Sequence, residues 1–166
     1  MALNSRSPKL DMTDNLLDVK LKNHQRALLH KTIEIDRKYC GTSFPFGLIS
    51  DKTGSGKTYV ILALIFYLIE FFESKGPNII VVPHNIYSQW ITSIKKLIGK
   101  KLKCKYLTEY KDINQLFTNN KMLYNYDIIL TTSLHYNSFA TTLKSLNMGV
   151  NRIFFDEADT MKDLLM

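Results

Sequence analysis

A glycine-containing loop between two apolar segments constrains the fold of this chain most strongly. The loop reads Asp51-Lys-Thr-Gly-Ser-Gly-Lys-Thr58; it follows the apolar run Phe46–Ser50 and leads into a long apolar helical pattern. A buried strand, a tight glycine turn and a helix in this order are typical of a parallel α/β sheet. Glycine at positions 54 and 56 permits positive φ angles, so we expect backbone N–H groups to converge there on an anion.

The side chains of the loop fit the phosphates of a nucleoside triphosphate. Lys57 would reach the β- and γ-phosphates, and the Thr58 hydroxyl would bind Mg²⁺. The N-terminus of the following helix would add further N–H donors. The full phosphate-loop pattern has a glycine where this chain has Asp51, so a chance Gly-Ser-Gly turn before a capped helix is the alternative interpretation. The predicted phosphate-binding residues are Thr53, Gly54, Ser55, Gly56, Lys57 and Thr58.

An acidic pair follows the last apolar run of the chain. Residues 152–155 are predicted to form a buried parallel strand, and Asp156 and Glu157 come directly after it. Open α/β sheets bind their ligands at the carboxyl ends of the strands. Asp156 is therefore expected to hold Mg²⁺ through water, and Glu157 to orient and deprotonate the attacking water; with Lys57 they form the predicted catalytic set. The alternative is an exposed acidic turn that caps a helix starting near Thr160.

Composition limits the classes of function. The 166 residues suffice for one domain with a substantial core, and the formal charge of +7 favours an anionic partner, nucleic acid before others. Cys40 and Cys104 have no metal-ligand spacing and form no disulfide framework, which fits an intracellular, reducing compartment. The apolar run Tyr59–Ile69 is too short to cross a bilayer and no signal-peptide core is present, so no membrane partner is expected.

Strand and helix patterns alternate along the chain. Solidly apolar runs predict buried strands, and a segment with alternating lysines predicts a strand with one wet face. This arrangement predicts an α/β fold with a parallel sheet and helices on both faces. The domain is expected over residues 19–166, after a flexible arm over residues 1–18. The predicted strands are 46–50, 79–82, 102–107, 127–130 and 152–156, and the predicted helices are 21–39, 59–74, 86–98, 112–117 and 139–146.

Several segments resemble the motifs of one group of enzymes. The loop resembles motif I of superfamily 2 helicases, in which glycine is not expected at the position of Asp51, and its form is closest to that of SWI/SNF-type translocases. Ile79–Trp90 is similar to motif Ia of that group, and residues 127–133 are similar to its Thr-Thr segment, motif Ib. Asp156–Asp159 resembles motif II in the spelling of DEAD-box proteins, and Leu21–Gln25 resembles the upstream glutamine motif.

The resemblance implies the first RecA-like P-loop NTPase lobe of a two-lobed enzyme, cut short after motif II. It implies ATP and Mg²⁺ as cofactors, nucleic acid as a partner, DNA in preference to RNA, and a second RecA-like lobe in cis or on a partner chain. Gln25 would recognise adenine through its amide, the alternative being an exposed helix residue. The implied nucleic-acid contacts address the backbone and not the bases. They are Pro83, His84, Thr131 and Thr132.

Two classes of function remain open. The first is the ATP-binding lobe of a nucleic-acid-dependent ATPase that couples hydrolysis to movement on DNA or RNA. The second is a non-catalytic ATP- or nucleic-acid-binding module, or a subunit of a viral transcription complex, because helicase-like ATPases of large DNA viruses are similar as well. The expected location is intracellular, in the nucleus or cytoplasm, or in the host cytoplasm or virion if the protein is viral. Six lysines between positions 95 and 105 either follow a nucleic-acid backbone or only solvate a surface.

Overall fold

The described strands form one four-stranded sheet in which every neighbouring pair is parallel, in the order β2-β3-β1-β4. The computed structural model describes residues 3–10, 17–39, 47–50, 54–72, 76–118 and 122–157. The strands are β1 (Asn78–Val82), β2 (Cys104–Tyr106), β3 (Ile128–Thr132) and β4 (Arg152–Phe155). The helices are α1 (Asn23–Tyr39), α2 (Lys57–Phe72), α3 (Tyr87–Leu97), α4 (Tyr110–Phe117) and α5 (Ser133–Ser145), with 3₁₀ turns η1 (His84–Ile86) and η2 (Leu123–Asn125).

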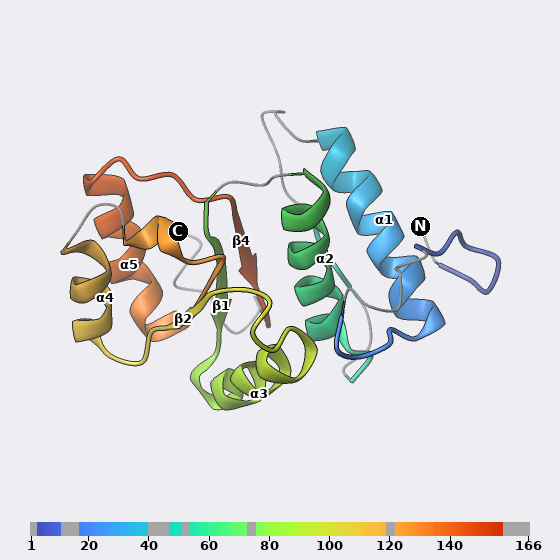
Figure 1. The fold of residues 1–166 in the computed structure, drawn as a ribbon, viewed down its shortest axis with the longest axis horizontal. Helices are drawn as coiled ribbons and strands as arrows, with labels where there is room; N and C mark the ends of the chain where they lie inside the picture. The colour runs from blue at the N-terminus through green and yellow to red at the C-terminus, as the bar shows by residue number, and fades with distance from the viewer. Residues whose placement is uncertain are drawn as a thin grey trace.

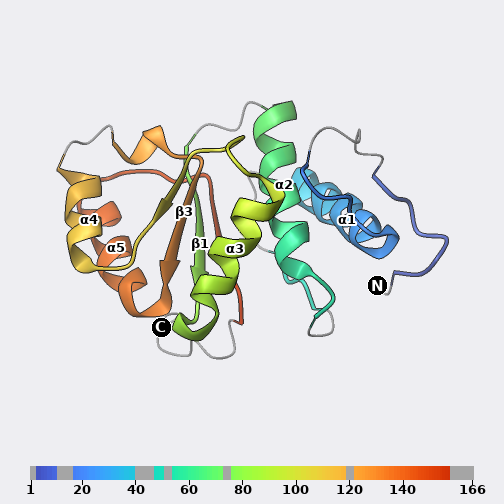
Figure 2. The same ribbon diagram turned by 60° about the horizontal axis from the view of Figure 1, so that its bottom comes forward.

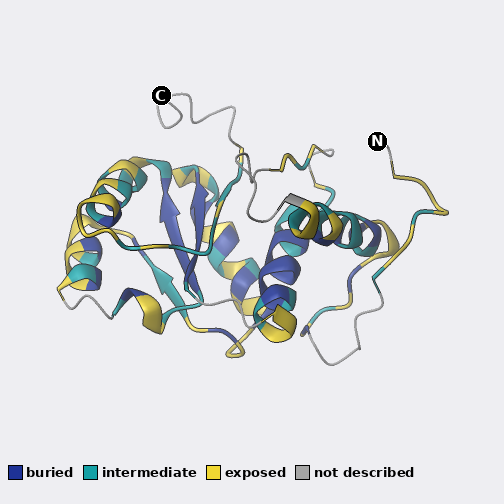
Figure 3. Cartoon of the chain, turned by 90° about the horizontal axis from the view of Figure 1, so that it is seen from above, coloured by how far each residue is buried: buried dark blue, intermediate teal, exposed yellow. Residues whose placement is uncertain are grey.

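Helices cover both faces of the sheet, which confirms the predicted α/β class (Figure 1). Helices α4 and α5 lie on one face, α3 and α2 lie on the other, and α1 packs on the outer side of α2. The position of α2 between α1 and the sheet explains why its sequence is apolar on every side. Figure 3 shows that most of α2 and the central strands are buried, while the outer helices expose one side.

The core consists of two clusters, one on each face of the sheet. Alternate residues of β1 point to opposite faces, so Ile80 and Val82 join the larger cluster and Ile79 and Val81 the smaller one. All five residues of β1 and all five of β3 are buried, as expected for strands covered on both sides. In the register, Val82 lies opposite Thr132 and Val81 lies opposite Phe155. The carboxyl ends of β1, β3 and β4 therefore meet at one end of the sheet, which we call the carboxyl edge.

The prediction of a buried strand before the glycine loop is wrong for the residues that the structure describes. Residues 47–50 have no strand conformation, and Leu48 is 86% exposed. Ile49 packs against the larger core cluster, but Gly47 adds no side chain and loses much conformational freedom on ordering. The segment therefore gains little from pairing as a strand. Phe46, the first residue of the predicted strand, lies outside the described residues.

Strand β4 forms as predicted, but the prediction that it is buried is wrong. Its partner is β1, and within the described part of the chain no strand pairs with its other side. Ile153 is 40% exposed as a result, and the other three residues are only half-buried. The apolar run Ile-Phe-Phe signalled a strand correctly, but an apolar run does not reveal whether a strand has one neighbour or two.

The remaining elements differ from prediction mainly at their ends. Helix α5 begins at Ser133, six positions before the predicted start, because its first turns are polar and lack an apolar period. The described part of the predicted arm contacts the domain: Leu17 is buried, and Arg26 Nε donates a hydrogen bond of 2.9 Å to the Leu10 carbonyl. Among the described helices, none combines the length and apolarity needed to cross a membrane.

Candidate nucleotide-binding site

The glycine loop has the backbone conformation that its sequence predicts. Gly54 has a φ of 80° and Gly56 a φ of 85°, in the region that residues with a Cβ atom rarely adopt. Helix α2 starts directly afterwards, and the N–H groups of Tyr59 and Val60 donate to the Gly56 carbonyl at 3.0 and 3.3 Å. The loop therefore ends on a helix N-terminus, where unpaired N–H groups and the helix dipole favour an anion.

The start of α1 holds the centre of this loop. Gln25 Nε2 donates to the Ser55 carbonyl at 3.3 Å, and His24 Nε2 lies 3.1 Å from the same oxygen. The C=O and N–H of a trans peptide point in opposite directions. Because the Ser55 carbonyl points towards α1, the Gly56 N–H points away from it, as an anion-binding nest requires. A Cβ atom at Gly56 would collide with Gln25 Nε2, so a larger residue would displace this amide from Ser55 and would also be strained by the positive φ.

The Ser55 hydroxyl is buried and lacks a hydrogen-bond partner among the described residues. A buried hydroxyl without a partner costs free energy, and phosphate oxygens would supply the missing acceptors. This observation favours an anionic ligand at the loop over a purely structural turn.

The structure places the other loop residues as follows. Lys57 and Thr58 occupy the first turn of α2 and are half-buried, whereas Thr53 lies outside the described residues. Figures 1 and 2 both show the start of α2 at the same end of the molecule as the carboxyl ends of β1 and β4. The loop and the acidic pair therefore belong to the same end of the fold, as the sequence predicted.

The acidic pair directly follows β4. The Asp156 N–H donates to the Val81 carbonyl at 3.0 Å, which extends the pairing with β1 by one residue. Asp156 Oδ2 accepts a hydrogen bond of 2.9 Å from the indole Nε1 of Trp90, and Oδ1 accepts one of 3.2 Å from the Glu157 N–H. Glu157 is exposed and has a φ of 52°, a strained conformation for a residue with a Cβ atom. Strain of this kind is concentrated at functional sites.

The predicted nucleic-acid contacts lie at the same edge of the sheet. Pro83 and Thr132 are brought together because β1 and β3 are paired up to Val82 and Thr132. His84 is exposed, whereas the Thr131 side chain is fully buried. Thr132 is 2% exposed, and within the described residues its Oγ1 has no hydrogen-bond partner.

His135 comes just after a strand end in the sequence, a position that by default indicates a histidine in a surface loop, but the structure places it in helix α5 beside this edge. Its ring lies in the first turn of α5, and Nε2 is 3.1 Å from the Thr108 carbonyl. Its Nδ1 is buried and, among the described residues, has no partner. Its position three residues after Thr132, on a helix that starts at Ser133, was the only signal, and it required knowledge of where α5 begins.

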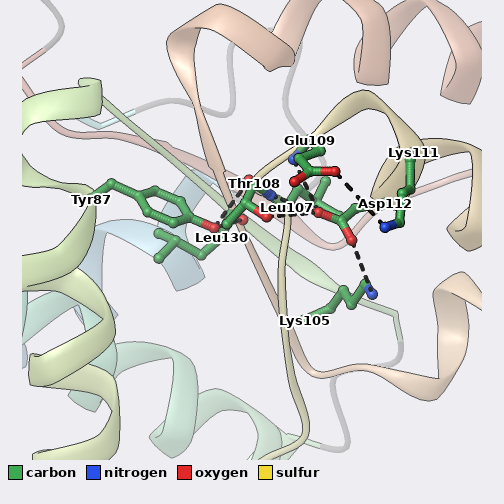
Figure 4. Close-up of polar contacts among 8 residues, drawn as sticks. All are labelled: Tyr87, Lys105, Leu107, Thr108, Glu109, Lys111, Asp112 and Leu130. Carbon is green, nitrogen blue, oxygen red and sulfur yellow. Dashed lines mark hydrogen bonds and ion pairs between the residues drawn. The ribbon is translucent and has the colours of Figure 1, made fainter.

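Tyr87, at the start of α3, is a second residue that the sequence did not reveal. Its hydroxyl donates to the Leu107 carbonyl at 3.0 Å and lies 3.3 Å from the Leu130 carbonyl (Figure 4). Burial, followed by the negative charge of Asp112, raises the pKa of the Tyr87 hydroxyl well above its ordinary value. The hydroxyl therefore remains a protonated donor, and it connects α3 to the end of β2 and the middle of β3.

The lysine-rich segment lies away from the predicted site. Five of these lysines, at positions 95, 96, 100, 101 and 103, lie at the end of α3 and before β2, near the amino ends of the strands and away from Thr132 and Asp156; Lys105 lies within β2. Lys101 forms an ion pair of 2.8 Å with Asp18, and Lys105 lies 3.8 Å from Asp112. This placement favours a solvated surface over a continuous nucleic-acid track.

Two other features do not belong to the predicted site. A cavity of about 370 Å³ lies between α1, α2 and the N-terminal segment, with Leu10, Ile33 and Tyr67 in its wall, and no predicted site residue lines it.

Burial raises the pKa of the Cys104 thiol to about 12, so the thiol stays protonated and unreactive at neutral pH. No cluster of three or more His, Cys, Asp or Glu exists among the described residues.

Comparison with known proteins matches nearly the whole chain to one family. The sequence pattern described as the SNF2-related domain matches residues 14–164. The ATP-dependent helicase BRM of Arabidopsis thaliana is 30% identical over 118 residues, which cover 70% of this chain and 5% of that protein. A protein of Acanthamoeba polyphaga mimivirus whose name proposes a helicase is 27% identical, with 68% of this chain and 19% of that protein covered.

A solved structure has the same fold. The Sulfolobus solfataricus SWI2/SNF2 ATPase core in complex with dsDNA superposes with a TM-score of 0.65 at 20% sequence identity. The superposition covers 93% of this chain and 30% of that one. The chain therefore spans less than a third of each of these three proteins.

Proposed function

This chain belongs to the SNF2-related domain family, and from that premise we propose that it is the ATP-binding lobe of a DNA-dependent ATPase that couples ATP hydrolysis to movement along DNA. One observation carries the proposal. A glycine loop with positive φ angles ends on the N-terminus of α2, at the same end of the fold as the acidic pair that follows β4.

The loop binds the triphosphate. The N–H groups of residues 54–58 surround the phosphate oxygens, and the Ser55 hydroxyl gains the partner that it lacks. Lys57 places its cation against the β- and γ-phosphates. Gln25 has one hydrogen-bonding position left on each amide atom, because Nε2 donates to Ser55 and Oε1 accepts from the Lys22 N–H at 2.9 Å. These two positions suit an adenine edge.

The acidic pair supplies the metal ligand and the base. The oxygen donors Thr58 and Asp156 fit Mg²⁺, which takes one or two protein carboxylates and otherwise keeps water and phosphate oxygens. When bound, Mg²⁺ neutralises charge on the β- and γ-phosphates. Glu157 is exposed beside this carboxylate, where it orients the attacking water and accepts its proton.

The carboxyl edge also binds the nucleic acid. His84, which is exposed beside Pro83, offers its imidazole and backbone to phosphates, whereas Thr132 contributes through its backbone, because its Oγ1 and the nearby His135 Nδ1 are buried. Groups of this kind contact the backbone and do not distinguish base sequences. Duplex DNA is the preferred ligand because the structurally similar ATPase core was solved on dsDNA.

A second RecA-like lobe, in cis or on a partner chain, completes the site. Its arginines stabilise charge on the transferring phosphoryl, a contribution of about 10³–10⁵ in rate in related enzymes. The test is phosphate release by this chain alone and by a protein that also contains the second lobe, each with and without duplex DNA and RNA. We expect slow release by the chain alone and DNA stimulation once the second lobe is present. Fast, nucleic-acid-stimulated turnover by the chain alone, or failure to bind nucleotide, would contradict the proposal.

A further inference from the structure

Trp90 makes a polar contact that a purely apolar core residue would not make. It is 2% exposed, and its Nε1–H donates to Asp156 Oδ2 at 2.9 Å, across 66 positions of sequence. An indole has one donor and no acceptor, so the direction of this bond is fixed. The acceptor is the carboxylate that the proposed function assigns to Mg²⁺. Trp90 is also the only tryptophan in the chain.

Helix α3 is anchored on both sides of β1. The chain runs from the end of β1 through Pro83 and η1 into α3 without a break. On one side, the Tyr87 hydroxyl bonds to the Leu107 and Leu130 carbonyls; on the other, one turn later, Trp90 bonds to Asp156. The helix therefore connects the end of β2 and the middle of β3 with the end of β4.

The carboxylate of Asp156 is held at both oxygens. Oδ2 accepts from Trp90 and Oδ1 accepts from the Glu157 N–H, so rotation of the carboxylate would break both bonds. An ionised carboxylate has about four acceptor positions, so each oxygen retains one for water or a cation. Hydrogen bonds from neighbouring groups commonly orient a metal ligand in this way.

We propose that Trp90 is a positioning residue, which fixes the Asp156 carboxylate for Mg²⁺ and links its position to that of α3. This role rests on the proposed function. A displacement of η1 and the start of α3, which follow the predicted nucleic-acid contacts Pro83 and His84, moves the indole and with it the carboxylate. DNA contact at this segment thus changes the position of the metal-binding carboxylate through one hydrogen bond, from Trp90 to Asp156.

The hydrogen bond itself is tested without nucleotide. Because the chain has one tryptophan, its proton–nitrogen NMR spectrum contains a single indole N–H resonance. Asp156→Ala removes the acceptor, so this resonance should move to the position of an indole without a hydrogen bond. Thr92→Val, which removes one exposed hydroxyl from the same helix, should leave it in place. An unchanged resonance in Asp156→Ala would overturn the proposal.

The positioning role is tested by the Mg²⁺ dependence of nucleotide affinity. In Trp90→Phe, we expect Mg²⁺ to support ATP binding roughly 10–100-fold less well, while affinity measured with chelator stays unchanged. Thr92→Val should stay within about twofold of wild type in both. Replacement of Trp90 by benzothienylalanine keeps the size and shape of the indole but substitutes sulfur for N–H, so it covers the case in which Trp90→Phe unfolds.

Failure of the positioning role of Trp90 can be distinguished from failure of the proposed function. If wild type binds ATP and the tryptophan variants keep its Mg²⁺ dependence, the positioning role is overturned and the proposed function stands. If wild type binds no nucleotide, the proposed function falls and the positioning role falls with it, whatever the indole resonance shows.

Discussion

Arg152 and Asp36 are joined by two parallel hydrogen bonds of 2.8 Å, from Nε to Oδ1 and from Nη2 to Oδ2. Asp36 lies on α1, whose first turn holds the Ser55 carbonyl through Gln25. Arg152 begins β4, which ends immediately before Asp156. The ion pair therefore connects the helix that supports the phosphate loop with the strand that carries the acidic pair.

Asp36→Asn should destabilise the fold measurably. Both side chains of the pair are less than a quarter exposed, at 22% and 23%, and the variant removes the charge of the carboxylate that accepts both hydrogen bonds. Hydrogen bonds to charged groups contribute about 1.5–3 kcal/mol, so we expect a loss of that size in denaturant unfolding. Glu34→Gln, which removes the exposed pair with Lys31 on the same helix, is the control and should change little. Equal effects of the two variants would contradict this assignment.

Gly56→Ala should be more disruptive than Gly54→Ala. Both residues have positive φ, which costs about 1–3 kcal/mol for alanine, but only the Gly56 methyl would strike Gln25; nothing lies within 4 Å of a methyl at Gly54. The double variant Gly56→Ala with Gln25→Ala should therefore recover part of the stability lost by Gly56→Ala. Thermal unfolding of wild type, Gly54→Ala, Gly56→Ala, Gln25→Ala and the double variant checks this, and strictly additive losses would show that the collision is not relieved by removing the glutamine.

Asp112 should contribute stability that disappears in acid. Burial opposes its ionisation, but N–H donors from Thr108 and Glu109, the Thr108 hydroxyl and Lys105 outweigh that effect and lower the pKa of Asp112 below its ordinary value of 3.8 (Figure 4). A lowered native pKa stabilises the fold above pH 3.8, and this contribution is lost as pH falls through the native value.

The variant Asp112→Asn should accordingly show a weaker dependence of unfolding free energy on pH below about 4, because one carboxylate no longer titrates. Thr108→Val removes one of the three donors and should give a smaller change in the same direction. Denaturant unfolding across the acid range measures both. An acid dependence in Asp112→Asn as steep as that of wild type would refute the stabilising role of the ionised Asp112 carboxylate at the start of α4.

DNA binding should depend on His84 and not on the lysine-rich segment. His84→Ala removes an exposed imidazole at the carboxyl edge, so affinity for mixed-sequence duplex should fall. Charge reversal at Lys100 and Lys101, at the opposite edge, should change affinity only as far as the net charge does. Fluorescence anisotropy at several salt concentrations decides, because loss of true phosphate contacts makes the salt dependence shallower. A shallower slope in the lysine variant alone would place the DNA on the other edge.

The sequence predicted best what is encoded in consecutive residues. The conformation of Gly54 and Gly56 follows from their lack of a side chain, and the buried strands β1 and β3 follow from solid apolar runs between turn signals. Contacts between distant segments were not predictable in this way. The bond from Gln25 to Ser55 spans 30 positions and the one from Trp90 to Asp156 spans 66, and neither spacing has a local signal. Both contacts orient groups that the sequence predicted to belong to the site.

The two wrong predictions have the same physical origin. Residues 47–50 and β4 were both expected to be buried because they are apolar, but burial of a strand depends on its neighbours. Strand β4 contacts β1 alone among the described strands, and Ile153 remains exposed. Composition determines whether a segment can be buried, whereas the sheet order determines whether it is.

The most direct test of the central claim is calorimetric titration of ATP with Mg²⁺ into three proteins: wild type, Lys57→Ala and Glu157→Gln. Loss of the lysine removes a charged donor worth about 1.5–3 kcal/mol, so Lys57→Ala should bind roughly 10–100-fold more weakly than wild type. Glu157→Gln keeps the shape of the glutamate but not its basicity, so it should bind like wild type. Equal affinity of wild type and Lys57→Ala, or loss of binding in Glu157→Gln, would contradict the assignment of phosphate binding to the loop and water activation to the acidic pair.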